Sequence, residues 1–82
     1  MDKQYLRNRI IEIIVVACYA EPDTADIRDE LPFKDLGLDS LDMVLIIMSL
    51  EDEFKLVFDN REYSNEMTLG ELVDLVLRKM SL

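Results

Sequence analysis

Histidine and tryptophan are absent from this sequence, and only one cysteine, two glycines and two prolines occur in its 82 residues. A catalytic thiol usually needs a histidine as its base, so the lack of histidine argues against cysteine catalysis. Cys18 is alone, which excludes an intramolecular disulfide and a thiolate zinc cluster, and its apolar neighbours predict a small core residue. Gly37 and Gly70 are isolated, so no glycine-rich phosphate loop is present. The acidic stretches also lack the ligand spacing of a calcium loop, and we expect no metal site.

Long apolar runs are absent as well. No stretch approaches the ~18 apolar residues of a transmembrane helix. The first 20 residues resemble a signal peptide in part, but Glu12 interrupts their apolar run, and a signal peptide keeps that run unbroken. The apolar residues follow helical spacing instead, which predicts an amphipathic core helix. We expect a cytoplasmic protein without a membrane span. These residues are Leu6, Ile10, Ile13, Ile14 and Ala17.

Acidic charge is concentrated in the middle of the chain. The net charge is −9, and residues 21–54 alone carry eleven acidic side chains against two basic ones, a net −9. Residues 1–20 sum to +1 and residues 55–82 to −1. A field of this sign repels nucleic acid and anionic lipid and attracts basic protein surfaces. It is equally typical of a solvated acidic loop that keeps a domain soluble, and charge alone leaves both interpretations open.

The hydrophobic periodicity predicts a small all-α bundle of three to four helices, forming one domain over residues 1–82. The first helix is expected to run from Asp2, a candidate N-cap, to Tyr19. A long acidic connection should then cover about 21–38. The second helix should begin near Asp39 or Ser40 and end at about Phe54.

The carboxyl-terminal part predicts one more long helix. Thr68 and Glu71 have the spacing of a capping box, in which each side chain accepts a hydrogen bond from the other's backbone N–H. Between the second and last helices we expect a short helix near Tyr63. Residues 55–58 could form a strand, but one strand without a partner makes no sheet. The apolar face of the last helix is predicted to contain Leu69, Leu72, Val73, Val76 and Met80.

The second helix is apolar on two opposite faces. One face is expected in the core and consists of Met43, Ile46, Ile47, Leu50 and Phe54. The other consists of Leu41, Val44, Leu45 and Met48. A bundle of this size has one core, so we expect the second face to be exposed, and an exposed apolar surface bordered by charge is typical of a docking site. The alternative is a central helix whose outer face is covered by the acidic connection.

Ser40 stands at the start of this helix, within the segment "DLGLDSLDM" (35–43). A hydroxyl at this position is most often an N-cap. Asp39 can cap the helix instead, which would leave Ser40 free at a place suited to a phosphate ester, because N–H groups and the positive end of the helix dipole converge there. As a nucleophile Ser40 would need a base; no histidine exists, and nothing in the sequence would desolvate Lys34. We therefore interpret Ser40 as a residue that another enzyme modifies.

Residues 35–42 resemble the attachment motif of acyl carrier proteins, and "MSLEDEF" (48–54) is similar to the acidic second half of that family's second helix. The order of the expected helices and the chain length also fit the family. The resemblance implies a carrier and not an enzyme. A phosphopantetheinyl transferase would attach 4′-phosphopantetheine from coenzyme A to Ser40, flanked by Asp39 and Leu41. Acyl groups would then be carried as thioesters on the terminal sulfur of this arm.

The resemblance further implies a monomeric carrier whose partners are acyl-transferring and chain-elongating enzymes with basic docking patches. The residues that the resemblance assigns to these partners are Asp42, Val44, Met48, Glu51, Asp52 and Glu53. Leu45 is added to them because it lies on the exposed apolar face of the second helix.

Some residues depart from the pattern of fatty-acid carriers. Leu45 stands where those carriers usually have a glutamate, and Asn60, Arg61 and Ser64 reduce the acidity expected further along. A carrier for polyketide or another specialised biosynthesis is therefore as compatible with the sequence as a fatty-acid carrier. A different class is also open: an unmodified helical module that binds a partner through the exposed face of the second helix.

Overall fold

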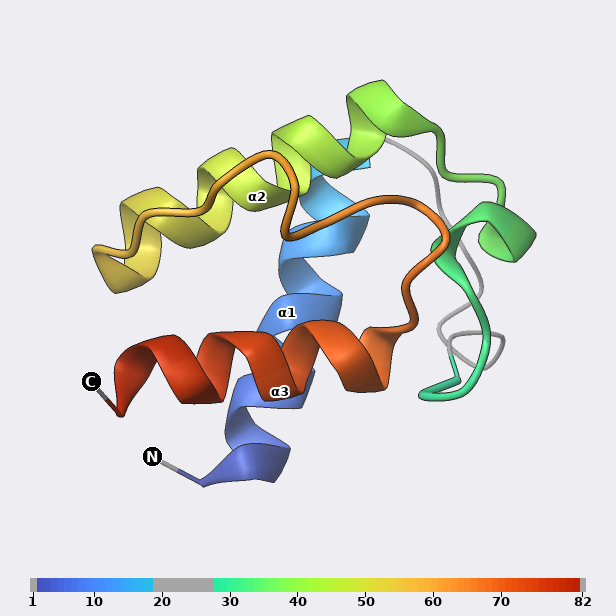
Figure 1. Cartoon of the computed structure of the whole chain (residues 1–82). Coiled ribbons are helices and arrows are strands. Elements are labelled where there is room, and N and C mark those ends of the chain that lie inside the picture. The colour runs from blue at the N-terminus through green and yellow to red at the C-terminus, as the bar shows by residue number, and fades with distance from the viewer. Residues whose placement is uncertain (1, 19–27, 82) are drawn as a thin grey trace.

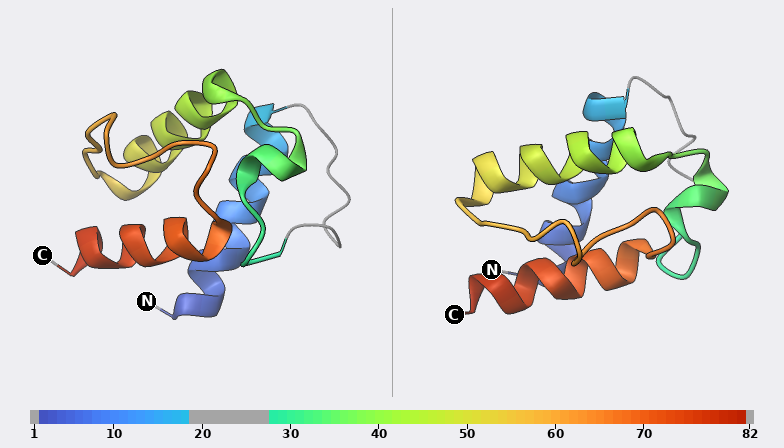
Figure 2. Two further views of the ribbon diagram at one scale, coloured as in Figure 1. Left: turned by 45° about the vertical axis from the view of Figure 1, so that its right-hand side comes forward. Right: turned by 45° about the horizontal axis from the view of Figure 1, so that its top comes forward.

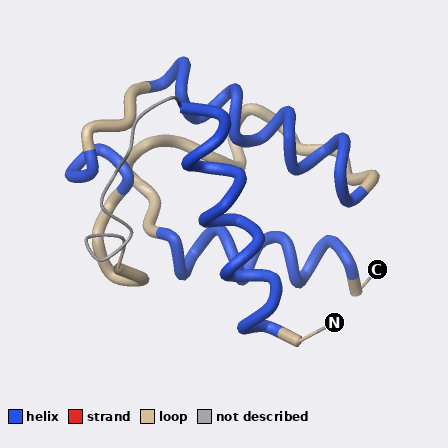
Figure 3. The backbone as a smooth tube through the Cα atoms, turned by 180° about the vertical axis from the view of Figure 1, so that it is seen from behind, coloured by secondary structure: helices blue, strands red, loops and turns tan. Residues whose placement is uncertain are grey.

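Three α-helices and one short 3₁₀ helix form the regular structure of residues 2–18 and 28–81, the part of the chain that the computed structural model describes. In chain order these are α1 (Lys3–Cys18), the 3₁₀ helix η2 (Phe33–Leu36), α2 (Ser40–Phe54) and α3 (Leu69–Met80). In Figure 1, α2 and α3 cross the molecule in front of α1. Figure 3, which shows the molecule from behind, places α1 over both of them, and α1 packs against each. The prediction of a small all-α bundle is confirmed.

The first helix begins at Lys3, directly after Asp2, the expected N-cap. The Asp2 carboxylate accepts a hydrogen bond from the Gln4 backbone N–H at 3.2 Å, which satisfies one of the donors left open at a helix start. The predicted apolar face is buried at Leu6, Ile10, Ile13 and Ile14, with Ala17 packed at its edge. The predicted end at Tyr19 and the predicted burial of the Cys18 side chain lie outside what the structure describes. None of the described helices is both long enough and apolar enough to cross a membrane.

The capping box of α3 is present. Thr68 Oγ1 accepts the Glu71 N–H at 3.1 Å, and Glu71 Oε1 accepts the Thr68 N–H at 3.0 Å. Leu69, Leu72, Val73 and Val76 are buried as predicted, and Leu75 is buried with them, whereas Met80 at the end of the helix is exposed.

The described part of the connection before α2, residues 28–38, contains the 3₁₀ helix η2, which the sequence analysis did not predict. Phe33, at the start of η2, is fully buried, and its backbone N–H donates to the Met67 carbonyl at 2.9 Å. The Lys34 N–H donates to the Asn65 carbonyl at 2.7 Å. Gly37 ends η2 with φ of 84°, in the left-handed region where glycine carries no steric penalty. Contacts with residues 65–67 therefore hold this turn and lead the chain to the start of α2.

The short helix expected near Tyr63 is not formed, and residues 55–58 form no strand. The segment between α2 and α3 instead runs along the side of these two helices that faces away from α1, as Figures 1 and 2 show. Phe58 is buried, and its backbone N–H donates to the Glu51 carboxylate at 3.0 Å. Lys79 Nζ donates to the Val57 carbonyl at 3.0 Å and lies 4.9 Å from the centre of the Phe58 ring. Contacts from α2 and α3 thus replace the hydrogen bonds of a helix here.

Candidate functional site

The start of α2 is capped by two aspartates, each of which accepts a hydrogen bond from the other's backbone N–H. Asp39 has extended backbone angles, and its Oδ1 accepts the Asp42 N–H at 2.9 Å. Asp42 Oδ2 in turn accepts the Asp39 N–H at 3.0 Å. This is a capping box in which Asp39 is the N-cap, and the negative carboxylates also lie at the positive end of the helix dipole.

Ser40 is the first residue of α2, and it is exposed. Because Asp39 caps the helix, the Ser40 hydroxyl is not needed as a cap, and it forms no hydrogen bond with any described residue. The backbone N–H groups of Ser40 and Leu41 belong to the first turn, where no intrahelical acceptor exists. The position therefore offers an accessible hydroxyl beside the donors and the dipole end that favour a phosphate group.

Leu38, the residue before the N-cap Asp39, is fixed in the core. Leu38 is buried, its N–H donates to the Phe33 carbonyl at 3.2 Å, and its own carbonyl accepts Asn65 Nδ2 at 3.1 Å. These contacts anchor the chain two residues before Ser40, so the hydroxyl is presented from a firmly held helix start.

The two faces of α2 are arranged as the sequence predicted. Met43, Ile46, Ile47 and Leu50 are buried, and Phe54 packs at the edge of the core. The opposite face is exposed, with 66% of Leu41 and 58% of Met48 accessible to solvent. Val44 and Leu45 lie between them and are exposed to a lesser degree. At about 100° per residue, Leu41, Leu45, Met48 and Asp52 form a strip that points directly away from the core, with Val44 beside it.

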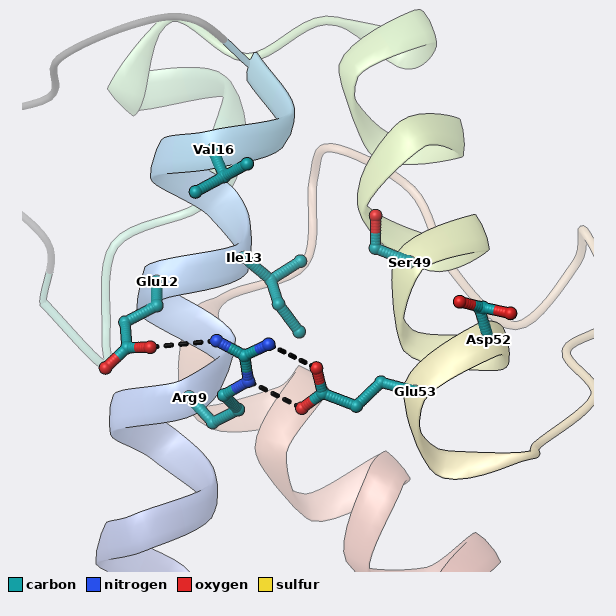
Figure 4. Close-up of a pocket in the computed structure, with 7 residues that line it drawn as sticks. All are labelled: Arg9, Glu12, Ile13, Val16, Ser49, Asp52 and Glu53. Atoms are coloured by element: carbon teal, nitrogen blue, oxygen red, sulfur yellow. Dashed lines mark hydrogen bonds and ion pairs between the residues drawn. The ribbon is translucent and has the colours of Figure 1, made fainter.

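The acidic residues of α2 have different surroundings. Glu51 faces the segment after α2 and accepts the Phe58 N–H. Glu53 faces α1, where both of its oxygens accept hydrogen bonds from Arg9, and Arg9 also donates to Glu12 (Figure 4). These bonds from Arg9 hold the pKa of the Glu53 carboxyl below its ordinary value. Asp52 is exposed and forms no ion pair with a described residue.

A groove of about 220 Å³ lies between α1 and α2, and Figure 4 shows its lining. Ile13 and Val16 supply its apolar part, and Ser49 and Asp52 border it on the α2 side. Ser40 does not line this groove. The candidate attachment residue lies on the open surface of the molecule. Among the described residues, no group of three or more acidic, cysteine or histidine side chains could hold a metal ion.

Sequence reasoning found the helix start and the exposed face but missed the Arg9 pair, because 44 residues separate its partners. It also missed the role of Phe33. A single aromatic residue within an acidic connection, just after Pro32, was the available signal for burial.

Comparison with known proteins identifies the family of the chain. The family model described as "Phosphopantetheine attachment site" matches residues 8–76. Two sequences of "Non-reducing polyketide synthase pks12" from Talaromyces marneffei are each 35% identical over 76 residues, or 93% of this chain. The chain spans only 4% of the length of these relatives. Since the family model covers most of the chain, the protein belongs to the phosphopantetheine attachment-site family, the acyl carrier proteins and carrier domains that bear a covalent 4′-phosphopantetheine.

Proposed function

We propose that Ser40 receives the 4′-phosphopantetheine arm and that the chain carries acyl intermediates as thioesters on it. The observation that supports this most directly is the Asp39 cap, because it leaves the Ser40 hydroxyl exposed and without a hydrogen-bond partner among the described residues. The residues present fit the group: an accessible hydroxyl, two open N–H donors and the positive end of α2 suit a phosphodiester.

Attachment requires a partner enzyme, because the chain contains no histidine that could take the proton from Ser40. In the proposed step the Ser40 oxygen bonds to the phosphorus that bears the pantetheine group of coenzyme A. The pyrophosphate P–O bond breaks, adenosine 3′,5′-bisphosphate leaves, and a base of the phosphopantetheinyl transferase takes the hydroxyl proton. Once attached, the arm supplies a thiol that can form and release thioesters. The protein itself holds and presents Ser40.

The exposed side of α2 is the proposed docking surface for the transferase and the acyl-transferring enzymes. Its apolar part is formed by Leu41, Val44, Leu45 and Met48, and its acidic candidates are Asp42, Glu51, Asp52 and Glu53. Apolar side chains exposed on one face, beside a residue that must be reached by other enzymes, fit a transient partner interface.

We place the carrier in polyketide or related specialised biosynthesis and not in general fatty-acid synthesis. Two observations support this: the 35% identity to a region of polyketide synthases, and Leu45, an apolar and partly exposed residue where fatty-acid carriers usually have a glutamate.

The experiment is intact-mass spectrometry after incubation with coenzyme A and a broad-specificity phosphopantetheinyl transferase. Wild-type protein should gain one arm, and Ser40→Ala should gain none. Ser49→Ala is the matched control, because Ser49 lies in the same helix but its hydroxyl already donates to the Leu45 carbonyl at 3.1 Å. Arm attachment to the Ser40→Ala protein, or none to the wild type, would refute the assignment.

A further inference from the structure

We propose that Arg9 determines which acidic residues of α2 meet partner enzymes: it withdraws Glu53 from the docking surface and leaves electrostatic recognition to Asp42, Glu51 and Asp52. This inference rests on the proposed function, because the docking surface concerns enzymes that act at Ser40.

The contact between Arg9 and Glu53 engages both oxygens of the carboxylate. Arg9 Nε donates to Glu53 Oε2 at 2.6 Å, and Arg9 Nη2 donates to Glu53 Oε1 (Figure 4). Such a two-bonded fork between guanidinium and carboxylate is stronger and more directional than a single charged hydrogen bond. Each oxygen of Glu53 keeps a further lone pair, but the guanidinium already compensates the charge of the carboxylate, so Glu53 attracts a partner's cation less than an unpaired carboxylate does.

Because Arg9 also binds Glu12, the negative charge that remains uncompensated lies closer to α1 than to α2. The third nitrogen of Arg9, Nη1, donates to Glu12 Oε2 at 2.8 Å. Arg9, Glu12 and Glu53 together sum to one negative charge, and Glu12 is the more exposed of the two carboxylates, with 65% of its side chain accessible against 31% for Glu53. The uncompensated charge is therefore centred beside α1, to one side of the strip that points outward from α2.

Asp52 differs from Glu53 although the two are neighbours in sequence. One residue turns the helix by about 100°, so Asp52 continues the outward strip of Leu45 and Met48, while Glu53 faces α1. Asp52 forms no ion pair with a described residue. Asp42 is ten residues earlier, about 15 Å along the helix axis, and by the same rotation it lies about 80° to one side of the strip, on the side where Glu53 lies. Asp42 also takes part in the capping box, but only its Oδ2 accepts a hydrogen bond there. A partner surface that fits has an apolar strip, one basic side chain in line with it at the Asp52 end, and another beside it at the Asp42 end.

The test is a set of charge variants of the full chain, assayed as kcat/KM for arm transfer by a phosphopantetheinyl transferase in low-salt buffer. Glu53→Gln should change kcat/KM by less than about 1.5-fold, whereas Asp52→Asn should lower it by roughly two- to fivefold, the size expected for an exposed steering charge. Arg9→Gln should raise it by roughly two- to fivefold, because it exposes Glu53 to the partner.

Lys3→Gln is the matched control for Arg9→Gln. It removes the same charge from the same helix, but Lys3 pairs with Asp74 at 3.1 Å, so it leaves the α1–α2 contact intact. It should leave kcat/KM within about 1.5-fold of wild type. The double variant Arg9→Gln/Glu53→Gln should return to the wild-type value, since the carboxylate that Arg9 masks is gone. Arg9→Lys, whose single ammonium cannot form the fork, should show a smaller gain and covers the case in which Arg9→Gln unfolds.

Three results would overturn the proposal: a loss with Glu53→Gln as large as with Asp52→Asn, equal effects of Arg9→Gln and Lys3→Gln, or a gain with Arg9→Gln that persists in the double variant. A second measurement does not depend on Ser40. Titration with hexalysine, followed by amide chemical shifts, should perturb Asp42 and Asp52 but not Glu53 in the wild type, and Glu53 as well in Arg9→Gln. If wild-type protein takes no arm, the assignment of Ser40 fails, and the hexalysine titration still decides the role of Arg9.

Discussion

At the scale of single residues, the start of α2 separates two tasks that one side chain could have performed. A serine at a helix start commonly accepts a backbone N–H, and a capping serine would have its hydroxyl engaged and turned toward the helix. Here Asp39 accepts the Asp42 N–H, and Asp42 completes the box. Stability therefore depends on Asp39, while Ser40 is available for chemistry.

This separation predicts unequal costs for two neighbouring substitutions. Asp39→Ala removes the cap and should lower the free energy of unfolding by about 1 kcal/mol, within the usual range for an N-cap. Ser40→Ala should change it by no more than roughly a few tenths of a kcal/mol, because alanine is also a good helix former. Urea unfolding followed by circular dichroism measures both values. A larger cost for Ser40→Ala would show that the serine hydroxyl supports the helix.

At the scale of the elements, the two faces of α2 should respond oppositely to truncation. Met48 is 58% exposed, so Met48→Ala leaves no cavity and should change the free energy of unfolding by less than about 0.5 kcal/mol. Leu50, two residues further on, is fully buried, and Leu50→Ala should cost about 2–5 kcal/mol. Urea unfolding of the two variants checks this. In transfer assays Met48→Ala should reduce kcat/KM although the fold is intact, and a variant that is both stable and fully active would remove Met48 from the docking surface.

The helices could be predicted from sequence because their signals are local. Asp2, Asp39 and the Thr68 box mark helix starts, and apolar spacing gives the buried faces. The predicted helix near Tyr63 was wrong, and η2 was not predicted. Both outcomes depend on contacts between residues that are far apart in the sequence. The Phe33 N–H in η2 donates to the Met67 carbonyl, and near Tyr63 the Lys79 side chain donates to Val57 and Glu62. The fork between Arg9 and Glu53 is of the same kind, so the docking acids could be proposed from sequence but not ranked.

The segment after α2 should lose stability in acid. Glu62 accepts the Asp59 N–H at 2.7 Å and Lys79 Nζ at 2.9 Å, and these two contacts, the backbone one first, lower the pKa of its carboxyl. A carboxyl whose pKa is lowered by folding contributes stability above its unfolded pKa and loses it as the pH falls through the folded value. The loss should therefore occur below pH ~4.3, the ordinary value for glutamate.

The measurement is hydrogen exchange of the Asp59 amide between pH ~5 and ~3, corrected for the intrinsic rate. Protection should fall with pH in the wild type, and Glu62→Gln should be less protected at pH ~5 and show a shallower decline. Glu66→Gln is the matched control, because Glu66 lies in the same segment and forms no ion pair with a described residue. Equal pH profiles for wild type and Glu62→Gln would show that the Glu62 contacts do not hold the segment.

At the scale of the whole molecule, acidic charge is unbalanced. Eighteen acidic side chains face nine basic ones, and five of the basic ones (Lys3, Arg7, Arg9, Arg61 and Lys79) form ion pairs in the described part of the chain. None of the five belongs to α2, which contains four acids and no base. Three of these acids lie in its last turns, next to the negative end of the helix dipole, which is unfavourable. Exposed ion pairs contribute little on average, so repulsion within and around α2 should dominate the electrostatics of folding.

Added salt should therefore stabilise the protein at neutral pH. Two like charges about 10 Å apart in water repel by roughly 0.4 kcal/mol, and several such pairs are comparable with the ~5 kcal/mol at the lower end of domain stabilities. The Debye length falls from ~30 Å at ~0.01 M salt to ~10 Å at ~0.1 M, and the radius of gyration is 11.5 Å, so screening at ~0.1 M acts across the molecule. The unfolded chain spreads the same charges further apart and gains less from screening.

Thermal scans at pH ~7 should show a melting temperature that rises between these two salt concentrations. Asp52→Asn should melt higher than wild type in dilute buffer and show a smaller rise, because it removes one repelling charge near the end of α2. A melting temperature that falls with salt would mean that the ion pairs of α1 and α3 outweigh the repulsion around α2.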